Sequence, residues 1–93
     1  MSNIPIDLKK VGKESVNKEI LRAALIAELD AVNLYEQMAA LTESEDLKKL
    51  LMDIAKEEKT HVGEFQAMLL NLDPEQKREL KEGRKEFDGF IER

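Results

Sequence analysis

The segment KEILRAALIAELDAVNLYEQMAAL, residues 18–41, is rich in Ala, Leu and Glu and contains neither Pro nor Gly. This composition favours a long α-helix, which we expect over residues 16–41. Apolar residues fall on two neighbouring stripes of that helix instead of one narrow face. We therefore expect the helix to pack on two sides, against the rest of its own chain and against another chain.

A second helix is predicted to follow the polar segment LTESED, residues 41–46. Beyond it, apolar residues recur in steps of three and four as far as Leu72, which is typical of one helical seam. We expect this helix over residues 45–71. Because the connection between the two helices is only a few residues long, they should lie antiparallel as a helical hairpin.

The segment LDPEQ, residues 72–76, predicts the start of a third helix. Asp73 is the expected N-cap, Pro74 suits the first helical position, and Gln76 has the capping-box spacing. This helix is expected over residues 74–90. It is short and highly charged, and we expect it to pack on the outside of the hairpin or against a neighbouring subunit.

The whole chain of 93 residues is predicted to form a single domain. Residues 1–15 show no hydrophobic period and contain Pro5 and Gly12, so they are predicted to be a lead-in to the first helix. The predicted fold class is all-α, an antiparallel two-helix hairpin plus a short C-terminal helix. A chain of this size buries a small core, so association with further copies is expected.

The composition limits the kinds of partner. Hydrophobic residues make up 42% and charged residues 38%, which is typical of neither a disordered nor a membrane-spanning chain. A net charge of -5 disfavours nucleic acid and anionic lipid and favours cations. The absence of cysteine excludes disulfides, thiolate metal sites and a thiol nucleophile. The N-terminal residues lack the apolar segment of a signal peptide, so a cytoplasmic location is expected.

Ionisable residues interrupt the apolar seams of both long helices. The stretch EEKTHVGEF, residues 57–65, contains the one histidine of the chain. Glu58 and His61 are three residues apart, so they share a helix face and can bind one ion together. Glu28 holds an equivalent position in the apolar stripe of the first helix. Burial of these groups costs free energy unless they are paired or coordinated.

Four-helix proteins can hold a di-metal carboxylate centre with one Glu from each of two helices and Glu-x-x-His from each of the other two. Glu28 on one helix and Glu58 with His61 on the next provide half of that set. A two-fold dimer would supply the other half and complete a four-helix bundle. Oxygen-rich ligands suit Fe(II) or Mn(II) better than zinc. The hypothesis is oxidation of Fe(II) to Fe(III) by dioxygen, with these three residues as metal ligands and catalytic groups.

Three further residues lie near this pattern. Tyr35 is two turns beyond Glu28 and could either hydrogen-bond a ligand carboxylate or pack as an ordinary core aromatic. Asp30 is a candidate for an iron-entry site, which would bind iron before it reaches the metal centre. Glu57 lies beside the seam, where a solvated position is favoured, although an acidic mouth could also attract cations.

Two alternatives to a ferroxidase remain open. The same ligands could support peroxidase-like or catalase-like chemistry at a di-iron or di-manganese centre. The chain could also be a non-catalytic helical interaction module, in which Glu58 and His61 pair with each other or with Arg22.

The segments AELDAVNLYEQMA, residues 27–39, and LLMDIAKEEKTHVGEFQAMLLNLDPEQ, residues 50–76, resemble the encapsulated ferritin family, ferritin-like domains associated with encapsulin. The resemblance covers most of residues 19–83. It implies a ferroxidase centre with two iron ions at each dimer interface, bound by Glu28, Glu58 and His61 with Tyr35 nearby. It also implies a ring of five dimers.

The resemblance further implies that iron is oxidised and stored inside an encapsulin shell, a nanocompartment of the cytoplasm. The sequence departs from the family pattern at three positions. Some relatives carry a tryptophan where this chain has Leu34, and an acidic pair that forms an iron-entry site where it has Ala27 and Asp30.

Overall fold

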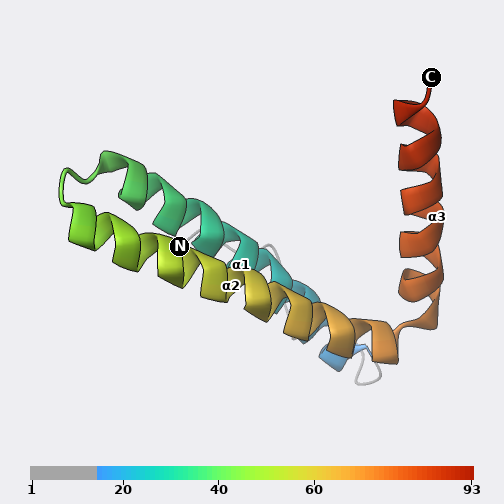
Figure 1. Ribbon diagram of the computed structural model, residues 1–93. Helices are drawn as coiled ribbons and strands as arrows, with labels where there is room; N and C mark the ends of the chain where they lie inside the picture. The colour runs from blue at the N-terminus through green and yellow to red at the C-terminus, as the bar shows by residue number, and fades with distance from the viewer. Residues whose placement is uncertain (1–14) are drawn as a thin grey trace.

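The computed structural model describes residues 15–93, which form the helices α1 (Val16–Leu41), α2 (Glu45–Leu72) and α3 (Pro74–Ile91). No strand occurs in this described range. Helices α1 and α2 lie side by side as an antiparallel hairpin, and α3 leaves the end of α2 at a steep angle (Figure 1). The predicted all-α fold with three helices is confirmed. Helices α2 and α3 each end one residue beyond the predicted boundary.

The predicted lead-in, residues 1–15, lies outside the described residues except for Ser15. Within residues 15–93, no helix combines the length and the apolar character needed to span a bilayer.

Two hydroxyl groups order the turn between α1 and α2. The Ser44 hydroxyl accepts a hydrogen bond from the backbone N–H of Leu47 at 3.2 Å, so Ser44 is the N-cap of α2. The Thr42 hydroxyl accepts from the N–H of Ser44 at 3.1 Å. Glu45 and Asp46 follow in the first turn, where negative charge is favourable near the positive end of the helix dipole. This turn starts α2 immediately and keeps the hairpin compact at that end.

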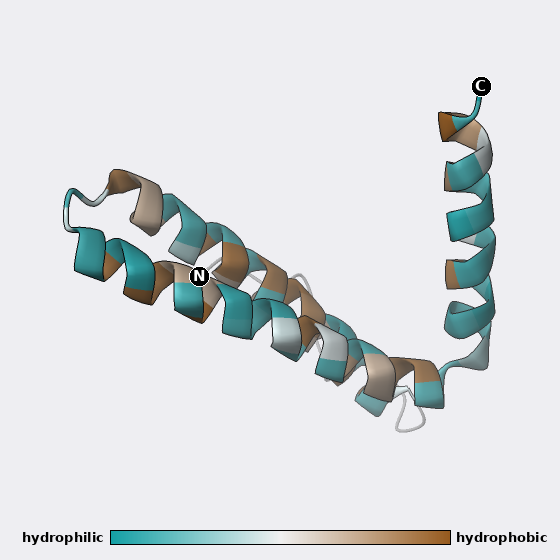
Figure 2. Ribbon diagram, viewed as in Figure 1, coloured by the Kyte–Doolittle hydropathy of each residue, from teal (hydrophilic) through white to brown (hydrophobic). Residues whose placement is uncertain are grey.

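The core of the hairpin is a thin apolar line between α1 and α2. Its buried members are Leu21, Val32, Ala39, Leu51, Ala55 and Leu69. Hydrophobic residues recur along both helices, and others lie on α3 (Figure 2). Two helices pack against each other along only one face of each. Many large apolar side chains on their other faces therefore stay exposed in the single chain.

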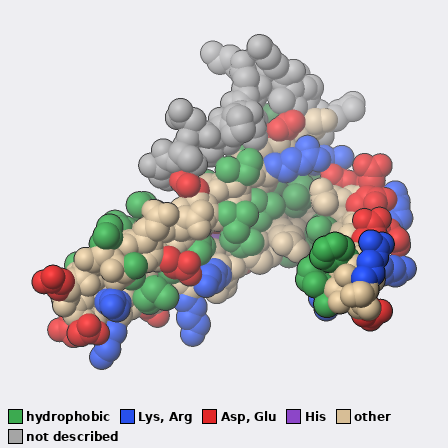
Figure 3. Space-filling view, turned by 90° about the horizontal axis from the view of Figure 1, so that it is seen from above, with side chains coloured by type: hydrophobic (Ala, Val, Ile, Leu, Met, Phe, Trp, Pro, Cys, Tyr) green, Lys and Arg blue, Asp and Glu red, His purple; other side chains and the backbone are tan. Residues whose placement is uncertain are grey.

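Helix α3 does not lie on the outside of the hairpin, one of the two positions predicted for it. Of the two other helices in residues 15–93, its residues approach only α2, and none of its side chains is buried. Phe87, Phe90 and Ile91 are exposed, and Figure 3 shows hydrophobic side chains on α3 and along the hairpin. The other predicted position, against a neighbouring subunit, stays a prediction.

Asp73 forms the corner between α2 and α3, as the N-cap predicted for α3. Its Oδ1 accepts a hydrogen bond from the N–H of Gln76 at 3.0 Å. Its Oδ2 pairs with Nη2 of Arg22 on α1 at 3.2 Å. One buried carboxylate therefore connects all three helices, and Pro74 occupies the first turn of α3 as expected.

Candidate metal centre

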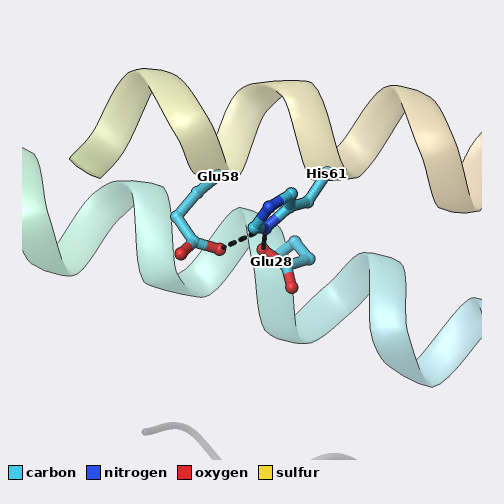
Figure 4. Close-up of side chains that lie close together, drawn as sticks. All are labelled: Glu28, Glu58 and His61. Carbon is cyan, nitrogen blue, oxygen red and sulfur yellow. Dashed lines mark ion pairs between the residues drawn. The ribbon is translucent and has the colours of Figure 1, made fainter. Parts of the chain in front are cut away.

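Helices α1 and α2 bring three predicted ligands together near the middle of the hairpin. Glu28 comes from α1, whereas Glu58 and His61 come from α2, and the three side chains converge in the space between the helices (Figure 4). One potential ligand atom from each residue lies within 4.8 Å of the other two. The helical spacing of Glu58 and His61 places both on the face of α2 that meets α1.

The distances and exposures within this cluster suit a cation. The Nδ1 atom of His61 lies 3.4 Å from Oε2 of Glu28 and 3.5 Å from Oε2 of Glu58. The side chains of Glu28 and Glu58 are 20% and 18% exposed, and that of His61 is 45% exposed. Two largely covered carboxylates therefore lie beside a half-exposed imidazole.

The Oε2 atom of Glu28 is the strongest indication that this cluster suits a cation. It is buried and accepts no hydrogen bond from any of residues 15–93, because the His61 contact lacks hydrogen-bond geometry. A buried carboxylate oxygen without a donor costs free energy unless a cation or a protonated group satisfies it. The donor set of two carboxylates and one imidazole fits Fe(II) or Mn(II) chemistry.

Three donors are half of the protein ligand set of a di-metal carboxylate centre. The di-metal carboxylate centres of four-helix proteins draw their ligands from four helices, and α1 with α2 supplies two. The single chain thus presents half of such a ligand set, as expected from the sequence. The role of Glu28, Glu58 and His61 as metal ligands and catalytic residues stays a prediction, although the structure brings them together.

The three neighbouring candidates lie outside the ligand cluster. Tyr35 is half-buried on α1, and its hydroxyl makes no hydrogen bond within residues 15–93. Asp30 is half-buried on the same helix, whereas Glu57 is exposed on α2. Their predicted roles, in supporting a ligand or in iron access, stay predictions.

The sequence matches the rubrerythrin family over residues 19–90, a range that contains the whole ligand cluster. The chain belongs to the rubrerythrin family. The solved structure of the encapsulated ferritin domain from Pyrococcus furiosus is 56% identical, with a TM-score of 0.78. That match covers 92% of this rubrerythrin-family chain and 88% of the solved domain. The resemblance to encapsulated ferritins inferred from the sequence is confirmed.

Two curated relatives are longer than this rubrerythrin-family chain. The ferritin-like–encapsulin shell fusion protein of Pyrococcus furiosus is 69% identical over 65 residues, which are 70% of this chain and 19% of that protein. The encapsulin nanocompartment cargo protein EncC of Myxococcus xanthus is 40% identical over 62 residues, 67% of this chain and 48% of that protein. The match thus spans about a fifth of the first relative and about half of the second.

Two ion pairs between the helices of this rubrerythrin-family chain were not found from its sequence. Arg22 pairs with Asp73 and with neither Glu58 nor His61, which removes one of the pairings considered for an interaction module. The Nζ atom of Lys59 lies 3.1 Å from Oε2 of Glu36. Arg22 and Glu36 are 14 residues apart on α1, and Lys59 on α2 is likewise 14 residues before Asp73, the C-cap of α2. In an antiparallel hairpin, these equal separations allow both pairs of opposite charges to face each other in one alignment of the helices. This was the feature of the sequence that could have indicated the two ion pairs.

Proposed function

We propose that this rubrerythrin-family chain is a ferroxidase whose centre is completed when two copies meet. The observation that carries the proposal is the convergence of Glu28, Glu58 and His61, whose ligand atoms lie within 4.8 Å of one another. One buried carboxylate oxygen of this cluster accepts no hydrogen bond from the part of the chain that the structure describes. A two-fold axis beside this cluster brings a second identical set of ligands to the first. The completed set then matches the di-metal arrangement of four-helix carboxylate proteins.

The side chains have distinct tasks in this reaction. The carboxylates of Glu28 and Glu58 bind Fe(II), the substrate, and neutralise part of its charge as it becomes Fe(III). The neutral imidazole of His61 donates a nitrogen lone pair. Two Fe(II) ions each lose one electron, and dioxygen with two protons takes up both electrons to give one hydrogen peroxide and two Fe(III) ions. The protein supplies position and charge, and the metal carries the redox change.

The product is proposed to collect inside an encapsulin shell. Both curated relatives are named for encapsulin, one as a shell fusion and the other as nanocompartment cargo. An open assembly of small helical chains, such as a ring of five dimers, encloses no storage volume of its own. A surrounding shell would retain the ferric product within the cell.

The decisive experiment adds Fe(II) to the anaerobic protein, admits air, and follows ferric absorbance and native mass. We expect rapid ferric formation, binding of two iron ions per dimer, and a mass of at least a dimer. Glu58→Gln removes one ligand charge with little change in shape and should abolish the rapid phase. Glu64→Gln makes the same change at an exposed position on α2 and is the matched control.

A non-catalytic interaction module is the second candidate function, because His61 lies within ion-pair distance of both carboxylates. In that case Glu58→Gln and Glu64→Gln would bind iron equally, and Fe(II) would oxidise no faster than in buffer. Loss of iron binding in Glu58→Gln alone excludes this alternative.

A further inference from the structure

The part of α2 that carries two proposed ligands has no fully buried side chain in the single chain, although Val62 and Phe65 are half-buried there. The buried residues of α2 are Leu51, Ala55 and Leu69, and none lies between Ala55 and Leu69. Glu58 and His61 fall inside that interval. Their placement opposite Glu28 therefore depends on something besides deeply buried apolar side chains.

An ion pair joins the two helices within this interval. Lys59 lies between Glu58 and His61 in the sequence, so any rotation or sliding of α2 moves all three residues together. Its Nζ atom lies 3.1 Å from Oε2 of Glu36 on α1, with the side chains 61% and 41% exposed, respectively. A second interhelix pair, Arg22 with Asp73, lies nearer the other end of the hairpin. The two pairs restrain the alignment of α1 and α2 at separated points.

The metal-free cluster needs such a restraint. Glu28 and Glu58 bring two carboxylates close together at low exposure, and like charges in such a position repel. Repulsion would drive the two helices apart or turn one ligand outward before iron arrives. The cost of reversing that displacement would then be subtracted from the free energy of metal binding.

We propose that Lys59 and Glu36 are positioning residues, whose ion pair holds α2 in the alignment that keeps Glu58 and His61 opposite Glu28 before metal binds. This inference rests on the proposed metal centre and adds two residues that act on it without touching the ion. Since exposed ion pairs contribute at most about 1 kcal/mol, loss of the pair weakens Fe(II) binding roughly 2- to 5-fold.

A substitution at Lys59 distinguishes the positioning role from a general electrostatic effect on cation binding. Removing a positive charge near an anionic site strengthens cation binding if only long-range electrostatics acts. Loss of a positioning contact weakens binding instead. Lys59→Met is therefore expected to bind Fe(II) more weakly, against the electrostatic trend, and Glu36→Gln should weaken binding as well.

The test is anaerobic calorimetric titration of the full chain with Fe(II), repeated by visible absorption with Co(II), whose band intensities report ligand geometry. Lys56→Met, three residues earlier on α2, removes the same charge at another exposed position and is the matched control. The double variant Glu36→Lys with Lys59→Glu reverses the pair without changing net charge. We expect weaker binding and altered Co(II) bands in both single variants, with recovery in the double variant. Circular dichroism verifies that each variant is folded.

The inference is overturned if Lys59→Met binds Fe(II) as tightly as the wild type or more tightly, in parallel with Lys56→Met. It is also overturned if reversal of the pair gives no recovery while both single variants are weakened. Absence of Fe(II) binding by the wild-type chain would instead refute the proposed metal centre, and this inference with it. The wild-type titration therefore distinguishes the two failures.

Discussion

At the level of single residues, Glu58 shows how the proposed metal site would oppose the stability of the chain that carries it. Its carboxylate is largely covered and lies in a cluster with the carboxylate of Glu28. Two such charges are favourable around a divalent cation and unfavourable without one. A ligand set selected for metal binding is therefore expected to lower the stability of the metal-free protein.

Replacement of Glu58 by Gln should stabilise the metal-free protein while removing the stabilising effect of iron. Relief of the repulsion is worth about 1 kcal/mol, which raises the Tm of a chain of this size by roughly 4–8 °C. Fe(II) should raise the Tm of the wild type and leave that of the variant unchanged, because only the wild type binds it in the folded state. Anaerobic thermal unfolding at pH 8, with chelator or with Fe(II), measures both effects.

A decrease in the Tm of the metal-free Glu58→Gln variant would contradict this prediction. If Glu58→Gln lowers the Tm of the chelated protein, the Glu58 carboxylate stabilises the fold by its contact with His61. Such a result would favour the interaction module over the metal centre.

At the level of helices, the corner between α2 and α3 depends on the ionised form of Asp73. The N–H of Gln76 is the main cause that lowers the pKa of this carboxyl below its ordinary value. Burial acts in the opposite direction, and the positive charges of Lys18 and Arg22 lower the pKa further. Since the folded state favours the charged form, folding is stabilised wherever the carboxyl is ionised in both states.

The stability contributed by Asp73 should be fully present above about pH 4, the ordinary pKa of an aspartate. It should be lost as the pH falls below that value and through the lowered pKa of the folded state. Asp73→Asn keeps a capping oxygen but cannot carry the charge. The variant should therefore melt at a lower temperature than the wild type at pH 6, and the gap should close near pH 2.

Thermal unfolding of both proteins across this pH range tests the assignment. Other carboxylates titrate in both proteins, so the difference between the two melting curves isolates Asp73. A difference that stays constant with pH would show that the charge of Asp73 does not stabilise the corner.

The helices themselves could be predicted from local rules. Apolar spacing, the capping residues of the turns and the Asp73-Pro74 start of α3 act within a few residues, so the sequence alone indicates them. The convergence of Glu28 with Glu58 and His61 was also predictable. Each interrupts an apolar seam, and a short antiparallel connection brings the seams together.

Contacts between long side chains and the direction of α3 were not predictable in the same way. Asp73 was recognised as a cap, but its pairing with Arg22 depends on how far two flexible side chains reach across the hairpin. The pair of Lys59 with Glu36 likewise depends on how far the two side chains reach between the helices. The exposed position of α3 depends on the backbone path at one residue, Asp73, which the hydrophobic period does not encode.

For the whole molecule, the balance between buried and exposed apolar surface argues for association. Six hydrophobic residues are buried within the described range, whereas fourteen large hydrophobic residues are exposed. The described part of the chain extends over 46 × 44 × 20 Å, so little of it is remote from solvent. A single apolar line between two helices contributes little net stability once the conformational entropy of folding is subtracted.

Folding is therefore expected to depend on protein concentration. If two copies bury their exposed apolar residues against each other, each tenfold dilution removes about 1.4 kcal/mol of apparent stability per dimer. The Tm should fall by roughly 3–5 °C for each such step. Circular dichroism melts over a hundredfold range of concentration, with native mass measured at each, would record this dependence.

Fe(II) binding, measured over the same range of protein concentrations, tests whether the proposed function depends on dimer assembly. If the second copy supplies half of the ligands, Fe(II) binding should disappear at the concentrations where the dimer dissociates, even while helices remain. Without iron, the variant Glu58→Gln should dimerise at least as readily as the wild type, because its apolar surface is unchanged and the repulsion between carboxylates is relieved. A Tm independent of concentration, together with Fe(II) binding by a species of single-chain mass, would contradict the shared centre. It would require α1 and α2 of one chain to hold the metal by themselves.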